Sequence, residues 1–296
     1  MINKLAIVTG GNGDMGSCIT RAVAAAGYRV IMACNNPESG EPLRQQIIQE
    51  TKNPHIEIEQ LELRDLQNVV RFTERIEARK IPVALLMNNA GVMPPKSSIT
   101  QNGFNHTVSV NYIAPFLLTL RLLSSMERNS RIVNMISCTY AIGKIKLPQF
   151  FETGGCKHYH RIPVYSNTKL ALLLFTLELS KRIKERGITV NAADPGIVST
   201  KFIVMEQWFD PLTDIFFRPF IKKPQQGAAT AIHLLLNPQV QNITGAAFAD
   251  CKEISLSTKY KNSSLQKELW DATYRKIAPF LDKEKFYRSH NTATLQ

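Results

Sequence analysis

Residues 4–26 read Lys4-Leu-Ala-Ile-Val-Thr9-Gly10-Gly-Asn-Gly13-Asp-Met-Gly16-Ser-Cys-Ile-Thr-Arg-Ala-Val-Ala-Ala-Ala26. The apolar run 4–9 predicts a short buried strand, the glycines after it a turn, and the alanine-rich run before Gly27 a helix. A strand, a glycine-rich turn and a helix in this order can hold a pyrophosphate on free backbone N–H groups at the helix amino end. The stretch therefore predicts a nucleotide-binding α/β fold.

Strands and helices are expected to alternate along the rest of the chain. The predicted strands span residues 4–9, 28–34, 56–62, 82–88, 131–136, 188–193 and 244–249. The predicted helices span residues 14–26, 40–51, 66–79, 103–127, 163–186 and 225–236. Right-handed crossovers then give a Rossmann-like, doubly wound parallel sheet of about seven strands with helices on both faces. We expect one domain over residues 1–281 and a mobile tail over 282–296.

Composition narrows the class of protein. The chain has 296 residues, 44% of them hydrophobic, and a net charge of +12. Its basic residues are scattered and form no stripe interleaved with aromatics, so we expect no nucleic-acid partner. Five cysteines without paired spacing indicate a reducing compartment and no metal site, with Cys18, Cys138 and Cys251 as small buried side chains.

The chain is expected to be cytoplasmic and to contain no membrane span. No apolar run appears long enough to cross a bilayer, and the first strand begins too close to Met1 for a signal peptide.

Tyr165 and Lys169 stand one helical turn apart in Tyr165-Ser-Asn-Thr-Lys169-Leu-Ala-Leu-Leu-Leu-Phe. Both side chains should project from one helix face, where an ammonium favours the phenolate and pulls the pKa of the phenol toward neutrality. Such a phenol can exchange a proton with a hydroxyl or carbonyl oxygen. The same spacing recurs in Tyr140-Ala-Ile-Gly-Lys144, but only the copy at Tyr165 opens a long apolar helix.

Taken together, these features resemble the short-chain dehydrogenase/reductase family, and within it the retinol dehydrogenase-like branch. The residues that carry the family resemblance are Thr9-Gly10, Gly13, Gly16, Asn88-Asn-Ala-Gly91, Asn111, Ser137, Tyr165, Lys169 and Pro195-Gly196. The narrower match rests on Ala33-Cys-Asn-Asn36, Arg131-Ile-Val-Asn134, Gln226-Gly-Ala-Ala229, Phe248-Ala-Asp-Cys-Lys252 and Leu269-Trp270.

The chain departs from the family pattern in its glycine loop. Short members usually have a glycine at the position of Asp14, whereas this chain has its glycine one place earlier, at Gly13. The resulting spacing is the one associated with the family's extended branch. Because a carboxylate beside a pyrophosphate would be repelled, we expect the side chain of Asp14 to turn toward solvent.

The second departure concerns the cofactor. An acid at the end of the second strand selects NAD, and a nearby Arg pairs with the 2′-phosphate of NADP. Cys34 replaces the acid, and Asn35 replaces the Arg of the retinol dehydrogenase-like branch. Without a repelling carboxylate, and with Asn35, Asn36 and Ser39 as donors, we favour NADP(H) over NAD(H). Glu62 matches the family's acid for the adenine amino group, and Asp65 is expected to cap the next helix.

The resemblance implies a role for each matching residue. Tyr165 is the acid/base, Ser137 donates to the substrate oxygen, Lys169 binds the nicotinamide ribose, and Asn111 holds a water that connects Lys169 to solvent. The implied cofactor-binding residues are Thr9, Gly10, Gly11, Asn12, Gly13, Asp14, Met15, Gly16, Cys34, Asn35, Asn36, Leu61, Glu62, Leu63, Asn89, Ala90, Gly91, Tyr165, Lys169, Pro195, Gly196, Val198 and Thr200.

The substrate is expected to be a lipophilic alcohol, aldehyde or ketone, such as a retinoid, a sterol or a fatty aldehyde. Residues 200–224, the substrate lid of the family, are rich in aromatics, which suits a bulky apolar ligand. Basic residues beside these aromatics are also compatible with contact to a membrane surface. The candidate substrate-binding residues are Ser137, Thr139, Tyr140, Tyr165 and Trp208.

Three further hypotheses remain open at this point. The glycine spacing also suits a nucleotide-sugar epimerase or dehydratase of the extended branch, although Asn88-Asn-Ala-Gly91 counts against it. A catalytically silent nucleotide-binding protein is the other alternative, but such proteins typically lose the tyrosine or the lysine. The resemblance also implies a homodimer formed through the helices at 103–127 and 163–186.

Overall fold

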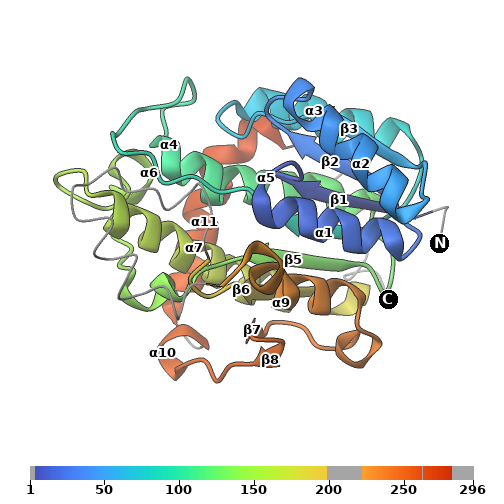
Figure 1. Cartoon of the computed structure of the whole chain (residues 1–296). Coiled ribbons are helices and arrows are strands. Elements are labelled where there is room, and N and C mark those ends of the chain that lie inside the picture. The colour runs from blue at the N-terminus through green and yellow to red at the C-terminus, as the bar shows by residue number, and fades with distance from the viewer. Residues whose placement is uncertain (1–3, 199–221, 262, 282–296) are drawn as a thin grey trace, which may run out of the picture.

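The computed structural model describes residues 4–198, 222–261 and 263–281. Its centre is an eight-stranded sheet with the order β3-β2-β1-β4-β5-β6-β7-β8 (Figure 1). The strands are β1 (Leu5–Thr9), β2 (Arg29–Cys34), β3 (Ile56–Gln60), β4 (Val83–Asn88), β5 (Arg131–Met135), β6 (Thr189–Asp194), β7 (Ala247–Ala249) and β8 (Lys252–Glu253).

The first seven strands are parallel, and the order reverses between β1 and β4. Strands β1 and β4 are buried along their whole length, which explains why both are nearly all apolar. In a doubly wound sheet, ligands bind beyond the carboxyl ends of the strands where the order reverses. The topology therefore places the ligand site next to Thr9 and Asn88.

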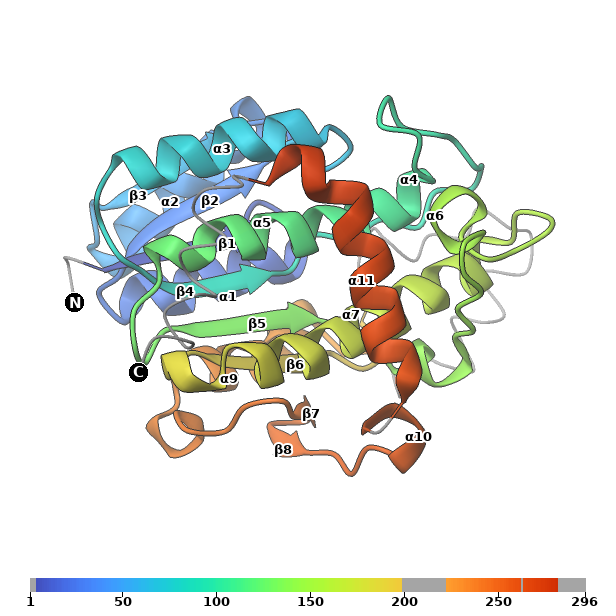
Figure 2. The same cartoon turned by 180° about the vertical axis from the view of Figure 1, so that it is seen from behind.

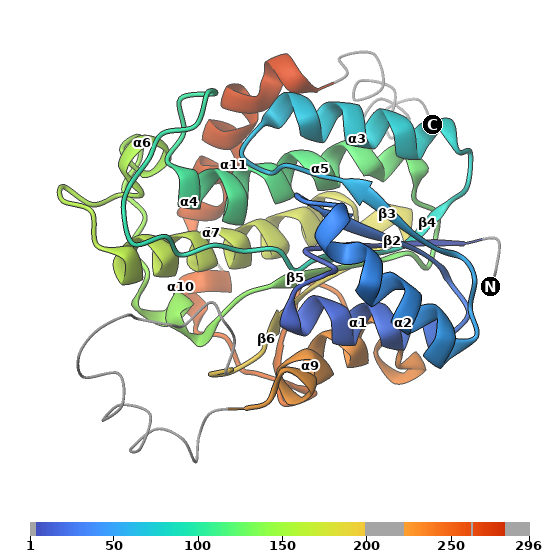
Figure 3. The same ribbon diagram turned by 45° about the horizontal axis from the view of Figure 1, so that its top comes forward.

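Helices cover both faces of the sheet, as Figure 3 shows. Helices α1 (Asp14–Ala25), α2 (Glu41–Thr51) and α9 (Pro224–Leu236) lie on one face. The other face carries α3 (Leu66–Ala78), the helix formed by α4 (His106–Val108), residues 109–113 and α5 (Ala114–Leu122), and α7 (Arg161–Arg182). Helix α11 (Ser264–Ile277) packs on the outside of α7 (Figure 2). The two short helices α6 (Phe150–Thr153) and α10 (Thr258–Lys261) lie in connections.

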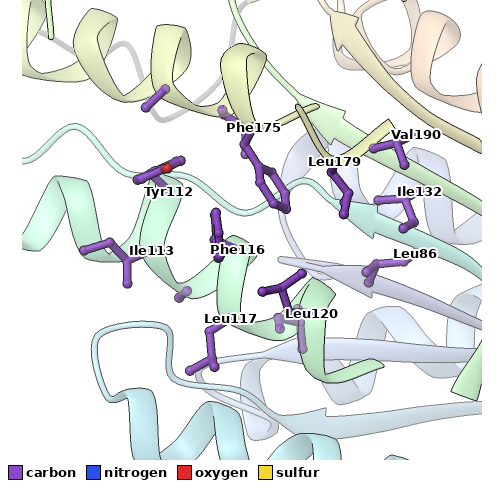
Figure 4. Close-up of a cluster of buried hydrophobic side chains, with 14 of the residues drawn as sticks. Leu86, Tyr112, Ile113, Phe116, Leu117, Leu120, Ile132, Phe175, Leu179 and Val190 are labelled. Atoms are coloured by element: carbon purple, nitrogen blue, oxygen red, sulfur yellow. The ribbon is translucent and has the colours of Figure 1, made fainter. Parts of the chain in front are cut away.

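The larger of the two apolar cores lies under α5 and α7. Figure 4 shows Phe116 of α5 and Phe175 of α7 facing each other, with Ile132 and Val190 of the sheet close by. The ring centroids of Phe116 and Phe175 are 4.6 Å apart, and Trp270 of α11 stacks on Phe175 at 5.9 Å. Aromatic side chains of this kind bury the largest apolar areas, so α11 is part of the core.

The helix that contains α4 and α5 is irregular in its middle. Residues Ser109–Ile113 form a π-helical turn, in which Asn111 is fully buried. Within the described residues, the span His106–Ser125 is the one helix long and apolar enough to cross a membrane. In the structure, 89% of its most apolar 18-residue window is buried inside the protein. The sequence analysis expected no apolar segment of membrane-spanning length, and this expectation is wrong. In the structure, however, the helix is part of the protein core.

The structure confirms the predicted fold class, with one additional strand. β8 pairs antiparallel with β7 through a turn in which Asp250 and Cys251 both have positive φ, 50° and 61°. Such a turn matches the twist of a two-residue hairpin. Asp65 caps α3, as predicted, by accepting a hydrogen bond from the backbone N–H of Gln67 at 2.9 Å.

The prediction about the cysteines is wrong. Cys138 is exposed, and Cys18 and Cys251 are partly exposed; Cys34 is the buried one.

Candidate active site

A cavity of about 650 Å³ opens at the carboxyl ends of the parallel strands. It runs from the ends of β2 and β3 to the amino-terminal part of α7. Its lining residues are Gly10, Asn12, Gly13, Asp14, Met15, Gly16, Ala33, Asn35, Leu61, Glu62, Leu63, Arg64, Asn89, Ala90, Gly91, Val92, His106, Val110, Met135, Ile136, Tyr165, Lys169 and Pro195. The size is in the range of small-molecule and cofactor sites.

The glycine loop is packed so tightly at Gly16 that a side chain does not fit there. Gly10 has φ of +63°, and a Cβ on Gly16 would lie 2.0 Å from the carbonyl oxygen of Gly10. α1 begins right after Gly13, and in the described part of the chain no side chain caps this helix end. A helix amino end in this position can donate to an anion in the cavity. Asp14 is exposed and lines the cavity.

Hydrogen bonds of Thr9 connect the glycine loop to the residues that follow β4. Its hydroxyl oxygen accepts hydrogen bonds from the backbone N–H groups of Asn89 at 2.9 Å and Ala90 at 3.0 Å. In return, the side-chain amide of Asn89 donates to the carbonyl oxygen of Thr9 at 2.9 Å. Thr9 does not line the cavity; it fixes the distance between the two loops that do.

At the other end of the cavity lie the residues that were predicted to contact the adenosine ribose of the cofactor. Some of them line the cavity and others do not. Asn35 lines the cavity, whereas Cys34 is buried and does not reach it, and burial raises the pKa of its thiol to about 11. Asn36 is exposed and accepts a hydrogen bond from Ser39 N–H at 3.4 Å. Asn12 donates from its amide to the hydroxyl of Ser39 at 3.0 Å. Cys34 and Asn36, which were predicted to contact the cofactor, therefore do not line the cavity.

Arg64 lines the same end of the cavity, and the sequence reading did not single it out. Its guanidinium pairs with the carboxylate of Glu62 at 3.0 Å, and its side chain is 56% exposed. Burial opposes the charge of Glu62, but the hydrogen bonds and charge of Arg64 still lower the pKa of Glu62. His106 lies nearby, and burial and the charge of Arg64 lower the pKa of its imidazole. This end of the cavity therefore carries the Arg64 guanidinium, and Glu62 accepts hydrogen bonds from only some of its N–H groups.

Tyr165, Lys169 and Ser137 come together at the reaction end. Tyr165 and Lys169 line the cavity from α7, and Lys169 Nζ lies 5.3 Å from the centroid of the Tyr165 ring. Ser137, just beyond β5, forms a side-chain hydrogen bond with Tyr165 and accepts one from Thr139 N–H at 3.4 Å. Lys169 Nζ donates to the carbonyl oxygen of Met135 at 2.8 Å. The second Tyr–Lys copy has its tyrosine in the short 3₁₀ turn Cys138–Ile142, with Tyr140 packed edge-on against Tyr260.

The electrostatics of this triad differ from the sequence-based expectation. Burial raises the pKa of Tyr165 well above its ordinary value; the hydrogen bond from Ser137 lowers it, and the charge of Asp194 raises it further. Burial lowers the pKa of Lys169 to about 8, while Asp194 acts in the opposite direction. Desolvation of both charged forms thus outweighs the mutual effect of ammonium and phenol. Burial thus favours the protonated form of the Tyr165 phenol.

Asn111 is placed by the π-helical turn. Its amide accepts from the N–H of Val92 at 2.8 Å and donates to the carbonyl oxygen of Val92 at 2.9 Å. It also donates to the hydroxyl of Thr168 at 3.2 Å, one residue before Lys169. π-helical turns often occur at functional sites. Asn111 therefore links the loop after β4 to the helix that carries Tyr165 and Lys169.

The expected site residues are distributed as follows. Those that do not line the cavity are Thr9, Gly11, Cys34, Asn36, Asn111, Ser137, Thr139, Tyr140, Gly196 and Val198. Thr200 and Trp208, with most of the expected lid, lie outside the described residues. The lining residues that sequence reasoning missed are Ala33, Arg64, Val92, His106, Val110, Met135 and Ile136. Met135 and Ile136 had a readable signal, because both end a predicted strand at the ligand edge of the sheet.

Several known proteins are similar to this chain in sequence and in fold. The sequence pattern of the short chain dehydrogenase family matches residues 4–150 and 152–207. Mouse (Mus musculus) retinol dehydrogenase 12 is 35% identical over 272 residues, covering 91% of this chain and 85% of its own length. Human (Homo sapiens) polyprenol dehydrogenase is 31% identical over 278 residues, covering 90% and 83%.

Solved structures share the same architecture. A blue fluorescent protein from a metagenomic library, in complex with NADPH, has a TM-score of 0.66 and 25% identity, covering 83% of this chain and 95% of its own. A short chain dehydrogenase from Burkholderia cenocepacia, in complex with NADP, has a TM-score of 0.68 and 23% identity, covering 83% and 96%.

The fold, the glycine cradle and the Tyr–Lys pair are those of a nicotinamide-dependent oxidoreductase, and the chain belongs to the short-chain dehydrogenase/reductase family. Within that family it is a member of the retinol dehydrogenase-like branch. It is therefore an enzyme that acts on CH–OH or C=O groups with NAD(P).

Proposed function

We propose that this enzyme transfers a hydride between NADP(H) and a lipophilic alcohol, aldehyde or ketone, with Tyr165 as the acid/base. The observation that carries the proposal is one continuous cavity that has the glycine cradle at one place and Tyr165 and Lys169 at another. A nucleotide held on the cradle and a small carbonyl compound held at Tyr165 would share this space. The site thus suits two reactants that must be brought together.

The residues present fit a nicotinamide dinucleotide. Glycine at position 16 lets the cradle close on itself, because a Cβ there would lie 2.0 Å from Gly10 O, and a helix amino end such as the start of α1 can donate to a pyrophosphate. Asn35, Glu62 and Arg64 would hold the adenosine end, and Lys169 and Pro195 the nicotinamide end. When bound, the cofactor supplies or accepts the hydride.

The chain's own groups supply the proton. Tyr165 is protonated at neutral pH and would donate to the oxygen of a carbonyl substrate, with Ser137 as a second donor to the same oxygen. Asn111 would connect Lys169 to solvent and so return the proton. Because burial holds the phenol protonated, this arrangement favours carbonyl reduction near neutral pH.

The substrate class rests on the relatives and on the surroundings of Ser137. The names of the relatives specify retinol and polyprenol, both long apolar alcohols. Thr139 and Tyr140 follow Ser137 in the short turn after β5, and Ile142 in the same turn is exposed. An apolar surface with few polar groups suits a lipophilic ligand.

Arg64 supports NADP(H) as the cofactor. Among the described lining residues, Arg64 and Lys169 are the two with permanent or near-permanent positive charge, and Lys169 lies at the opposite end. A guanidinium has five N–H donors, and Glu62 accepts from only part of them. A ribose phosphate near Asn35 would find the remaining donors within the same end of the cavity. NADPH is also the ligand of the 25% identical solved structure.

The proposal is tested by following NADPH and NADH oxidation with a panel of aldehydes and ketones that includes retinal and long-chain aldehydes. We expect turnover of the apolar substrates with NADPH preferred. The Arg64→Gln variant should lose about tenfold of the NADPH preference in kcat/KM, because a charge-assisted hydrogen bond to phosphate is lost.

Arg71→Gln is the matched control for Arg64. Arg71 is similarly exposed and pairs with Asp65, but it does not line the cavity, so its replacement should leave the cofactor ratio unchanged. Turnover confined to small polar substrates would contradict the lipophilic assignment. An unchanged NADPH to NADH ratio in Arg64→Gln would contradict the cofactor assignment.

A further inference from the structure

Asn167 stands between Tyr165 and Lys169 in α7, but its side chain does not line the cavity. It is 4% exposed and contacts the connection between β5 and α7. Its amide oxygen accepts a hydrogen bond from the backbone N–H of Lys144 at 2.6 Å, and its amide nitrogen donates to the carbonyl oxygen of Gly154 at 2.7 Å. One buried side chain thus binds two separate points of this connection to the helix.

Glycines let the connection approach α7 closely around Asn167. A Cβ on Gly143 would lie 2.6 Å from the carbonyl oxygen of Ser166, and a Cβ on Gly155 would lie 3.2 Å from the amide nitrogen of Asn167. Gly154 and Gly155 have φ of +68° and +81°, in the left-handed region that glycine adopts readily. The close approach and the two hydrogen bonds of Asn167 together fix the connection on the helix.

Backbone hydrogen bonds continue from Asn167 to Ser137. The N–H of Tyr140 donates to the carbonyl oxygen of Ser137 at 2.9 Å, and the N–H of Gly143 donates to the carbonyl oxygen of Tyr140 at 3.1 Å. The next residue is Lys144, whose N–H donates to Asn167. The serine and the buried amide of α7 are therefore the two ends of one hydrogen-bonded turn.

Side-chain packing contributes little to the position of this turn. None of its five residues, Cys138–Ile142, is buried, and Ile142 is 64% exposed. Tyr140 contacts Tyr260 edge-on, with ring centroids 5.5 Å apart. Because side chains outside the core bury little apolar area, the hydrogen bonds at the two ends of the turn set its place relative to α7.

We propose that Asn167 is a positioning residue, which holds the turn after β5 on α7 so that the hydroxyls of Ser137 and Tyr165 meet at one substrate oxygen. The inference rests on the proposed function, in which these two hydroxyls donate to that oxygen. Two donors stabilise a developing charge only where both are held at hydrogen-bonding distance from it, and a displacement of about 1 Å can cost much of the rate. Asn167 acts from outside the cavity, on the backbone that follows Ser137.

Asn167→Leu removes both hydrogen bonds and keeps a side chain of similar size. We expect kcat for carbonyl reduction to fall about tenfold, because the two hydroxyls are no longer aligned. The dissociation constant for NADPH should change little, since Asn167 does not line the cavity. If Asn167 acts through Ser137, the same substitution made in Ser137→Ala should change kcat by no more than about twofold.

Two outcomes of this comparison would overturn the proposal. One is an unchanged kcat in Asn167→Leu. The other is an equal loss in the wild-type and Ser137→Ala backgrounds, which would show that Asn167 supports α7 without acting through the serine.

Lys144 offers a matched pair of variants that leave Asn167 in place. Lys144→Pro removes the N–H that binds Asn167, and Gly143 before it has φ of −64° and ψ of 145°, a conformation favoured before proline. Its kcat should fall as in Asn167→Leu. Lys144→Ala removes only the exposed side chain and keeps the N–H, so its kcat should equal that of the wild type. Equal activity in the two variants would contradict the proposal, and this pair decides it if Asn167→Leu does not fold.

A measurement without substrate separates this inference from the proposed function. Amide hydrogen exchange at Tyr140 and Gly143 should be about tenfold faster in Asn167→Leu and Lys144→Pro than in the wild type, because the turn opens more often. Lys144→Ala should exchange at the wild-type rate. Unchanged exchange at both amides in Asn167→Leu and Lys144→Pro would overturn the link between Asn167 and the turn. Failure of the proposed function would appear separately, as turnover that survives in Tyr165→Phe.

Discussion

Burial decides the protonation of the two ionisable side chains at the reaction centre. Lys169 and Tyr165 are one turn apart, and their proximity by itself would favour an ammonium beside a phenolate. In the structure both are surrounded by protein, so each is shifted toward its neutral form. A sequence shows that two such residues are neighbours, but it does not show how much water they lose. For this reason the identity of the pair was predictable and the direction of its pKa shifts was not.

The lowered pKa of Lys169 makes the stability of the fold depend on pH. Folded Lys169 loses its proton near pH 8, whereas in the unfolded chain a lysine keeps it to about pH 10.4. Between these values the unfolded state binds more protons, so the free energy of unfolding rises with pH. We expect a rise on the order of 2 kcal/mol between pH 8 and pH 10 in urea unfolding.

The matched variant for this effect is Lys169→Met, which should remove that rise. The raised pKa of Tyr165 acts only above about pH 10, where an unfolded tyrosine ionises, and there it lowers stability as pH increases. If the wild-type protein and Lys169→Met show the same slope between pH 8 and pH 10, Lys169 is not the buried amine described here.

At the scale of elements, the turn between β1 and α1 depends on a close backbone contact between Gly16 and Gly10. The unusual glycine spacing puts Gly13 at the helix start, with φ of −78°, a conformation open to any residue. Gly16, in contrast, faces the carbonyl oxygen of Gly10. The loop therefore requires glycine at position 16 but not at position 13, although both glycines belong to the same sequence motif.

Gly16→Ala should weaken NADPH binding at least tenfold, because its Cβ would lie 2.0 Å from Gly10 O and the loop would have to open. Gly13→Ala is the control, since its Cβ would meet Gly10 O at 3.3 Å and its backbone is unstrained. Binding is measured by quenching of protein fluorescence. Equal losses in the two variants, or no loss in Gly16→Ala, would refute this account of the loop.

Strands formed by a run of apolar residues could be predicted from the sequence, whereas elements of only two or three residues could not. β1, β2, β4, β5 and β6 consist almost entirely of consecutive buried residues, so each was visible in the sequence. β8 contains only Lys252 and Glu253, and the turn before it uses positive φ at Asp250 and Cys251, which are not glycines. Arg64 looks like an ordinary polar residue after a strand, and only the sheet order brings it to the cavity.

At the scale of the whole molecule, α11 covers the helices through which the resemblance implied a homodimer. Trp270 packs against Phe116 of α5 and Phe175 of α7, and Arg182 lies over its ring at 4.3 Å. Figure 2 shows α11 crossing the outside of both helices. A dimer formed through α5 and α7 would have to displace this buried tryptophan, at a cost of several kcal/mol.

We therefore predict a monomer of 33.3 kDa in light scattering after size-exclusion chromatography. The apolar surface that would form an interface is already buried within the chain. A stable dimer whose interface maps to α5 and α7 by cross-linking would contradict this packing. A dimer that forms through another face would leave the packing of α11 intact.

We propose that Tyr165 transfers the proton in an enzyme that binds NADP(H) in the same cavity. The most direct measurement is the turnover number of Tyr165→Phe together with its affinity for NADPH. Loss of the hydroxyl should reduce turnover at least a hundredfold, in the range of general acid catalysis, while the dissociation constant for NADPH changes little. Turnover within a few fold of wild type, with NADPH bound normally, would contradict the account.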